Sequence, residues 1–349
     1  MPFKKKQPTN LRAKDLKEQA DATRAAASEL SDPKAKAAVN QGADTLAALA
    51  RHQAHTNRPG HIFELPDTAT SFDLKAHRCL RAIRHGDDVY LPNGHDLAVL
   101  FPNILLRSSL FSASNPGALL DRHTLGTPKN VSLEMDGPQL GYYDRRVFGA
   151  CLGHYQAEHP LASNEATHWI STTVWQLAEK IGTYNHNSPS AICDSLKRLE
   201  AVTLRIRTRL YEFPVHHLIE VAFDDTFTLV EAKEEQVKGA GRVRFRIQES
   251  MAALYGLNQW TAVSNRSLHD HEGLAAWICT FYASHKEPFE YSVSHFYSLT
   301  GAKGTLAEFR KRLRSALTKL QATKNADEHR VADFEMTKNT ITVTLARWR

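Results

Sequence analysis

The strongest chemical signal in this sequence is a set of basic and hydroxyl side chains at helical spacing. Lys311, Arg312 and Ser315, with Lys319 one turn later, share one side of the segment 305–323, and the other side is apolar. Ammonium and guanidinium groups arrayed in this way contact phosphates and guanine edges in nucleic acids. The alternative is the solvated face of an ordinary amphipathic helix.

A second set of candidates lies about 110 residues earlier. The segment PSAICDSLKRLEAV, which begins at Pro189, presents Ser190, Lys197 and Arg198 on the side opposite its apolar residues. The following LRIRTRLYEF alternates in the manner of a strand, and it places Arg205 and Arg207 on one face. We expect these two arginines to contact phosphate or the minor groove, with a solvated strand face as the alternative.

The elements that position the 305–323 helix follow a recognisable order. A short strand near 289 leads to a helix at 293–299, a turn at 300–304, the basic helix, and a hairpin at about 331–347. Thr305 followed by Glu308 matches a capping box. Lys303 and Gly304 lie at the helix start, where backbone N–H groups can bind a phosphate. This order predicts a winged helix-turn-helix.

The same order occurs earlier in the chain. A strand at 167–170, a helix at 172–181 ended by Gly182, and the helix from Pro189 are followed by a predicted hairpin at 217–232. SLKRLEA in the first copy resembles KRLRSAL in the second. This internal duplication favours tandem DNA-reading modules over a single solvated helix.

Other clusters invite an enzymatic interpretation, but each lacks part of its pattern. His216-His217 and His269-Asp270-His271 have no evident third metal ligand nearby, and Tyr142-Tyr143 has no flanking His-x-His of a nicking enzyme. Gly301 to Thr305 lacks the spacing of a phosphate-binding P-loop. We therefore expect no enzyme activity, no catalytic residue, no metal site and no cofactor.

Composition limits the class of protein. The 349 residues are 42% hydrophobic and 23% charged, with a net charge of +6, which suits two or three globular domains and a polyanionic partner. The four cysteines are far apart, as expected in a reducing cytoplasm. No apolar run approaches a membrane span, and MPFKKKQPTN precedes no apolar segment of a secretion signal.

These patterns predict an α+β fold with tandem winged helix-turn-helix domains. We expect an Ala/Lys-rich, helix-prone and partly disordered tail over 1–58, in which Pro33 interrupts any long helix. An extension follows over 59–100, and its residues predict no function. The two winged-helix domains are predicted over 101–247 and 248–349.

Five stretches from Phe101 onward resemble the TrfA-type plasmid replication initiators. They are FPNILLRSSLFSASN, LEMDGPQLGYYDRRVFGACLGHYQ, SLKRLEAVTLRI, and WICTFYASHKEPFEYSVSHFYSLTG with FRKRLRSALTKL. The specificity of the resemblance lies in their order and spacing. It leaves the first hundred residues unaccounted for.

The resemblance implies two winged-helix domains that bind repeated origin sites, called iterons, in double-stranded DNA. It also implies opening of adjacent DNA, recruitment of host DnaA and the replicative helicase, and a homodimer in equilibrium with monomer. A transcriptional regulator of the same fold is the alternative, and a nicking-type replication enzyme is a third possibility.

Overall fold

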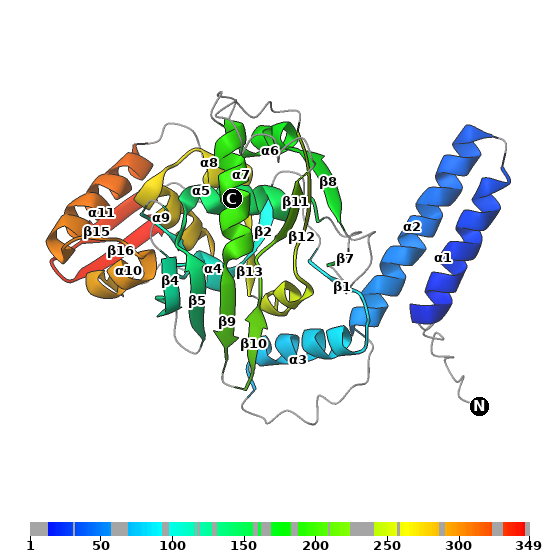
Figure 1. The fold of residues 1–349 in the computed structure, drawn as a ribbon, viewed down its shortest axis with the longest axis horizontal. Coiled ribbons are helices and arrows are strands. Elements are labelled where there is room, and N and C mark those ends of the chain that lie inside the picture. The colour runs from blue at the N-terminus through cyan, green and yellow to red at the C-terminus, as the bar shows by residue number, and fades with distance from the viewer. Residues whose placement is uncertain are drawn as a thin grey trace, which may run out of the picture. The chain divides into compact units, whose positions relative to one another are not determined.

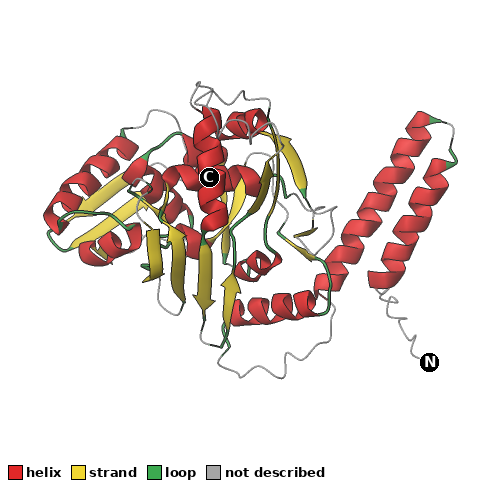
Figure 2. Ribbon diagram, in the orientation of Figure 1, coloured by secondary structure: helices red, strands yellow, loops and turns green. Residues whose placement is uncertain are grey.

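The computed structural model describes most of the chain, in two compact units, Met1–Pro66 and Asp67–Arg349. The described residues are 13–30, 32–56, 69–92, 98–114, 116, 119–127, 131–155, 160–161, 169–182, 188–208, 210–223, 241–256, 259–285, 290–322 and 331–345. Helices and strands are mixed in the second unit, whereas the first contains only helices among its described residues (Figure 2). The prediction of an α+β chain is confirmed.

The first unit is a pair of helices that lie side by side, α1 (Ala13–Ser28) and α2 (Pro33–Thr56) (Figure 1). Buried alanines, among them Ala27 and Ala43, let the two backbones approach closely. Pro33 occupies the first position of α2, where its missing N–H costs nothing. The helix-forming tendency predicted for this region is therefore confirmed, together with the interruption at Pro33.

The second unit contains the remaining elements. Its described helices are α3 (Ser71–Arg84), α4 (Asn103–Leu106), α5 (Tyr142–Leu152), α6 (Val174–Ile181), α7 (Ser188–Ala201), the 3-10 helix η3 (Glu249–Leu254), α8 (Asn265–His269), α9 (Gly273–Ala283), α10 (Val293–Thr300) and α11 (Leu306–Gln321). Its described strands are β1 (Val89–Tyr90), β2 (Ala98–Pro102), β3 (Phe111–Ser112), β4 (Leu119–Thr124), β5 (Ser132–Pro138), β6 (Leu140–Gly141), β7 (Pro160–Leu161), β8 (Ile170–Thr173), β9 (Thr203–Arg207), β10 (Glu212–Val215), β11 (Glu220–Phe223), β12 (Arg242–Arg246), β13 (Trp260–Ser264), β14 (Tyr291–Ser292), β15 (Val331–Met336) and β16 (Thr340–Leu345).

Two groups of these elements share one topology. We name α5, β8, α6, α7, β11 and β12 module 1, and α9, β14, α10, α11, β15 and β16 module 2. In module 1, β12 pairs with both β8 and β11, and in module 2, β16 pairs with both β14 and β15. The strand orders are therefore β8-β12-β11 and β14-β16-β15. This is the arrangement expected for a winged helix-turn-helix.

The first module carries an insertion between its third helix and its wing. Strands β9 and β10 form a hairpin after α7, and this hairpin joins β5 and β4 in a separate four-stranded sheet of order β10-β9-β5-β4. β11 pairs with β12. The turn and second strand of the predicted 217–232 hairpin, residues 224–232, lie outside the described residues, so this hairpin stays a prediction.

The hydrophobic core divides later in the chain than the predicted boundary at 247/248. Met251, Leu254 and Val263 belong to the cluster that contains module 1, and the second cluster begins at Ala275. The cause is a long-range pairing, because β13 forms a ladder with β2. The extension predicted over 59–100 also contributes to this first core, through Cys79 and other buried side chains.

Direct contacts fasten module 2 to the elements around module 1. The Ala113 N–H donates to the Thr300 carbonyl over 2.9 Å. The fully buried Arg145 donates to Thr280 Oγ1 over 2.6 Å, and burial lowers its pKa to about 9. The tightest approach is at Gly126, where a Cβ would lie 2.2 Å from the Ser298 carbonyl oxygen.

We predict that Gly126→Ala destabilises the chain, because the added methyl group meets backbone that cannot rotate away. Overpacking of this kind costs about 1–3 kcal/mol of unfolding free energy, measurable by urea denaturation. Gly153→Ala is the matched control, because a Cβ there would make only ordinary contacts at 3.5 Å or more. Equal stability of the two variants would contradict a tight junction at Gly126.

Candidate nucleic-acid interface

Helix α11 starts at a tightly specified turn. Gly301, with φ of 60°, ends α10 in the left-handed region that favours glycine. Thr305 and Glu308 then form the predicted capping box, because the Thr305 side chain accepts from the Glu308 N–H and the Glu308 carboxylate accepts from the Thr305 N–H. The Tyr297 hydroxyl donates to the Gly304 carbonyl over 2.7 Å, which joins the turn to α10. The orientation of α11 relative to α10 is thereby fixed.

The apolar side of α11 is buried and its basic side is exposed. Phe309, Leu313, Leu317 and Leu320 lie in the second core. The predicted binding residues Lys311, Arg312 and Ser315 are all exposed, as are Arg314 and Lys319. The amphipathic pattern therefore predicted this exposure correctly.

The exposed basic residues differ in their contacts. Arg312 donates to the Lys303 carbonyl, and Arg314 donates to the Met336 carbonyl over 3.4 Å. Lys311 and Ser315 make no hydrogen bond or salt bridge within the described part of the chain. An exposed helix face with several cations and few internal partners suits a polyanionic ligand.

The start of α11 is less suited to a phosphate than the sequence suggests. The N–H groups of Thr305 and Glu308 already donate within the capping box. The Glu308 carboxylate adds negative charge there, and hydrogen bonds from Thr305 lower its pKa. Lys303 remains exposed, so its side chain is the better candidate at this position than the helix N-terminus.

Helix α7 exposes a smaller charge than its sequence suggests. Ser190, Asp194 and Lys197 are exposed, so an acidic and a basic side chain share the face. Arg198 is turned inward. Its Nε and Nη2 donate to Asp144 Oδ1 on α5, over 3.0 and 2.8 Å.

Asp144 is fully buried and collects four hydrogen bonds. Besides the two from Arg198, it accepts from Ser195 Oγ over 2.7 Å and from the Gly141 N–H over 2.8 Å. A buried carboxylate requires such partners, because desolvation without them is costly. Arg198 therefore holds α7 against α5, a role that its place on a basic segment does not reveal.

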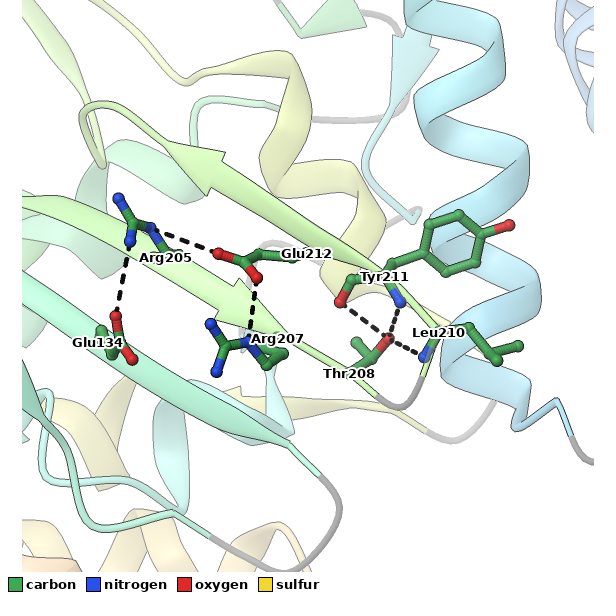
Figure 3. A network of polar contacts seen from close by, with 7 residues as sticks. All are labelled: Glu134, Arg205, Arg207, Thr208, Leu210, Tyr211 and Glu212. Atoms are coloured by element: carbon green, nitrogen blue, oxygen red, sulfur yellow. Dashed lines mark hydrogen bonds and ion pairs between the residues drawn. The ribbon is translucent and has the colours of Figure 1, made fainter.

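The structure places Arg205 and Arg207 outside the wing. Both lie on β9, in the inserted sheet, and face Glu212 on β10 (Figure 3). Arg207 Nε lies 3.0 Å from Glu212 Oε2, and Arg205 lies within 3.9 Å of both Glu212 and Glu134. Because carboxylates face both arginines, Arg205 and Arg207 are weaker candidates for a phosphate or minor-groove contact than their sequence predicts.

Strand β12, in the three-stranded sheet of module 1, carries three arginines that the sequence analysis did not propose as DNA contacts. Arg242, Arg244 and Arg246 alternate along β12 with buried Val243 and Phe245. The sequence shows these arginines alternating with apolar residues, which predicts a strand with one basic face. It does not show which strands pair with β12, so the place of this face in the fold could not be predicted.

Two of the residues that suggested enzymatic chemistry, Tyr142 and His269, are engaged in packing. The Arg146 guanidinium lies 5.3 Å from the centre of the Tyr142 ring. His269 is largely buried, and burial lowers its pKa to about 4. Among the described residues, no group of three or more His, Cys, Asp or Glu side chains could hold a metal ion. No described helix is long and apolar enough to cross a bilayer.

Comparison with known proteins gives a distant structural likeness. No family model matches the chain, and no curated protein matches it. It is similar to the crystal structure of RctB domains 2-3, with 10% identity and a TM-score of 0.43, over 68% of this chain and 95% of that one. It is also similar to the Pi initiator protein in complex with iteron DNA, with 12% identity and a TM-score of 0.42, over 72% and 97% of the two chains.

We predict that Arg198→Ala lowers the unfolding free energy by about 2–3 kcal/mol. The loss falls below the 3–5 kcal/mol of a fully buried pair, because the Arg198 side chain is 26% exposed. Its neighbour Lys197 is exposed, so Lys197→Ala stays within about 0.5 kcal/mol of the parent. Chemical denaturation of both variants checks this. A stable Arg198→Ala variant would contradict the positioning role.

Proposed function

We propose that this protein binds double-stranded DNA through its winged-helix modules, with α11 as the principal reading helix. The observation that carries the proposal is the exposed row of Lys311, Arg312 and Ser315 on the third helix of a helix-turn-helix. A helix of this kind enters the major groove, where Arg and Lys reach guanine edges or phosphates. Lys319 extends the same face by one turn beyond Ser315.

We further propose that the DNA is a plasmid origin with direct repeats and that the protein initiates replication there. Two modules of the same topology in one chain support this, because a single monomer can then contact two sites. The resemblance to TrfA-type initiators supports it as well. Recruitment of host DnaA and helicase, and a monomer–dimer equilibrium, belong to the same proposal, as does a cytoplasmic, plasmid-associated location.

A transcriptional regulator with the same modules is the second candidate. Its supporting observation is the same exposed α11 face, which serves an operator as well as an origin. The arrangement of the target separates the two, because a regulator that binds as a symmetric dimer has an operator with matching two-fold symmetry.

We predict that Lys311→Ala combined with Arg312→Ala weakens binding to the DNA that flanks the gene by about 2–5 kcal/mol. Each lost phosphate contact also lowers the salt slope by about 0.9. Fluorescence anisotropy titrations at several salt concentrations measure both quantities. The control is Arg205→Ala with Arg207→Ala, which removes two cations that already face glutamates. Equal losses in the two double variants would contradict a specific role for α11.

We predict that one chain protects about 20 base pairs of non-palindromic DNA. Equivalent faces on one side of B-DNA recur every 10–10.5 base pairs, so two modules that bind successive faces cover roughly two turns. The modules expose different side chains, so the two half-sites differ in sequence. Hydroxyl-radical footprinting at measured stoichiometry tests this. Two chains on a palindrome, or protection of about one turn, would favour the regulator.

A further inference from the structure

The outer face of the module 1 sheet is basic and aromatic. Strand β12 lies in the middle of that sheet, between β11 and β8. Its arginines alternate with the buried Val243 and Phe245, so they point away from the core. Arg242 and Arg244 are exposed and form no salt bridge within the described residues.

Neighbouring residues organise the rest of this face. Arg246 forms an ion pair with Glu220 on β11, with Nη2 2.6 Å from Oε2. The Arg244 and Arg246 guanidinium carbons lie 6.0 and 5.1 Å from the centre of the Trp169 ring. Such contacts restrain an arginine without neutralising it, because the attraction is to the ring quadrupole. We name Trp169, Arg242, Arg244 and Arg246 the β12 face.

The matching face of module 2 has the opposite character. Strand β16 occupies the place of β12, and its outward residues are threonines. Its neighbour β15 adds the exposed Asp333 and Glu335, which pair in register with Thr344 and Thr342. The positions on β16 that match the β12 arginines are therefore neutral, and the carboxylates lie on the adjacent strand β15.

The third helices of the two modules show the reverse distribution of positive charge. α11 exposes Lys311, Arg312 and further cations, whereas α7 exposes Asp194 beside Lys197 and uses Arg198 internally. The two modules therefore share a topology but place their positive charge on different elements, the helix in module 2 and the sheet in module 1.

We propose that module 1 binds the phosphate backbone of duplex DNA with the β12 face and that α7 contributes little to affinity. Charge complementarity selects the ligand, because two exposed guanidinium groups side by side can each bind a phosphate through two N–H donors. Arg242 lies close to the start of α6, since the Val174 N–H donates to the Gly241 carbonyl over 3.1 Å. The first residues of β12 therefore lie beside the start of α6. This inference rests on the proposed DNA-binding function.

The test compares full-length double variants on one duplex from the DNA that flanks the gene. Arg242→Gln with Arg244→Gln should weaken binding at least tenfold and lower the salt slope by about 2. Lys197→Ala should weaken it less than threefold. Arg242→Lys with Arg244→Lys should retain the salt slope, because the charges remain, and thus separates lost contacts from lost folding.

The matched control is Arg205→Gln with Arg207→Gln, which changes the same number of charges on the inserted sheet and should leave binding unchanged. Wild-type affinity of the Arg242/Arg244 glutamine variant would overturn the inference. A loss seen on single-stranded oligonucleotides but not on the duplex would also overturn it.

The α11 variant separates this inference from the proposed function. If Lys311→Ala with Arg312→Ala binds like the parent while the β12 variant does not, the role assigned to α11 fails and the β12 inference stands. If only the α11 variant loses affinity, the proposed function stands and the β12 inference fails.

Discussion

A single buried carboxylate sets the geometry of this protein's first module. Asp144 accepts four hydrogen bonds, from the backbone before α5 and from two side chains of α7. Burying that charge costs free energy, and apolar packing alone could stabilise the helix pair equally well. The carboxylate instead allows only one register of α7 against α5, because any slip leaves it without partners. The next two residues of α5, Arg145 and Arg146, donate to α9 and to the segment before it, so the same helix also positions module 2.

The structure also shows which parts of the fold local sequence determines. The bounds of α10 and α11, the left-handed Gly182 and Gly301, and the capping box at Thr305 follow from residues within one helical turn of each other. The burial of the α11 apolar side follows from periodicity. These features were predictable because the interactions that stabilise them are close in sequence.

Features that depend on distant partners were not predictable in the same way. Arg198 was assigned to DNA because its acceptor lies 54 residues away on another helix. Arg205 and Arg207 were predicted to contact phosphate or the minor groove because the sequence does not reveal the insertion of β9 and β10, which brings Glu212 beside them. The first hydrophobic core extends beyond the predicted domain boundary at 247/248 because β13 pairs with β2, more than 150 residues earlier in the chain. For the three arginines, the basic helix face and the alternating strand were identified correctly, but the carboxylates that contact these side chains lie on other helices and strands of the fold.

The close approach at Gly126 has a consequence for how such a protein could change its target. Backbone lies against backbone there, so main-chain atoms set the distance between α10 of module 2 and the segment that follows β4. One added base pair shifts the next groove by about 3.4 Å and turns it by roughly 35° around the DNA axis. Substituting side chains at this junction does not produce the combined shift and rotation of α10 that an added base pair would require. In a chain that binds as proposed, the backbone therefore restricts the spacing of the two half-sites, whereas their base sequences depend on side chains that can be exchanged.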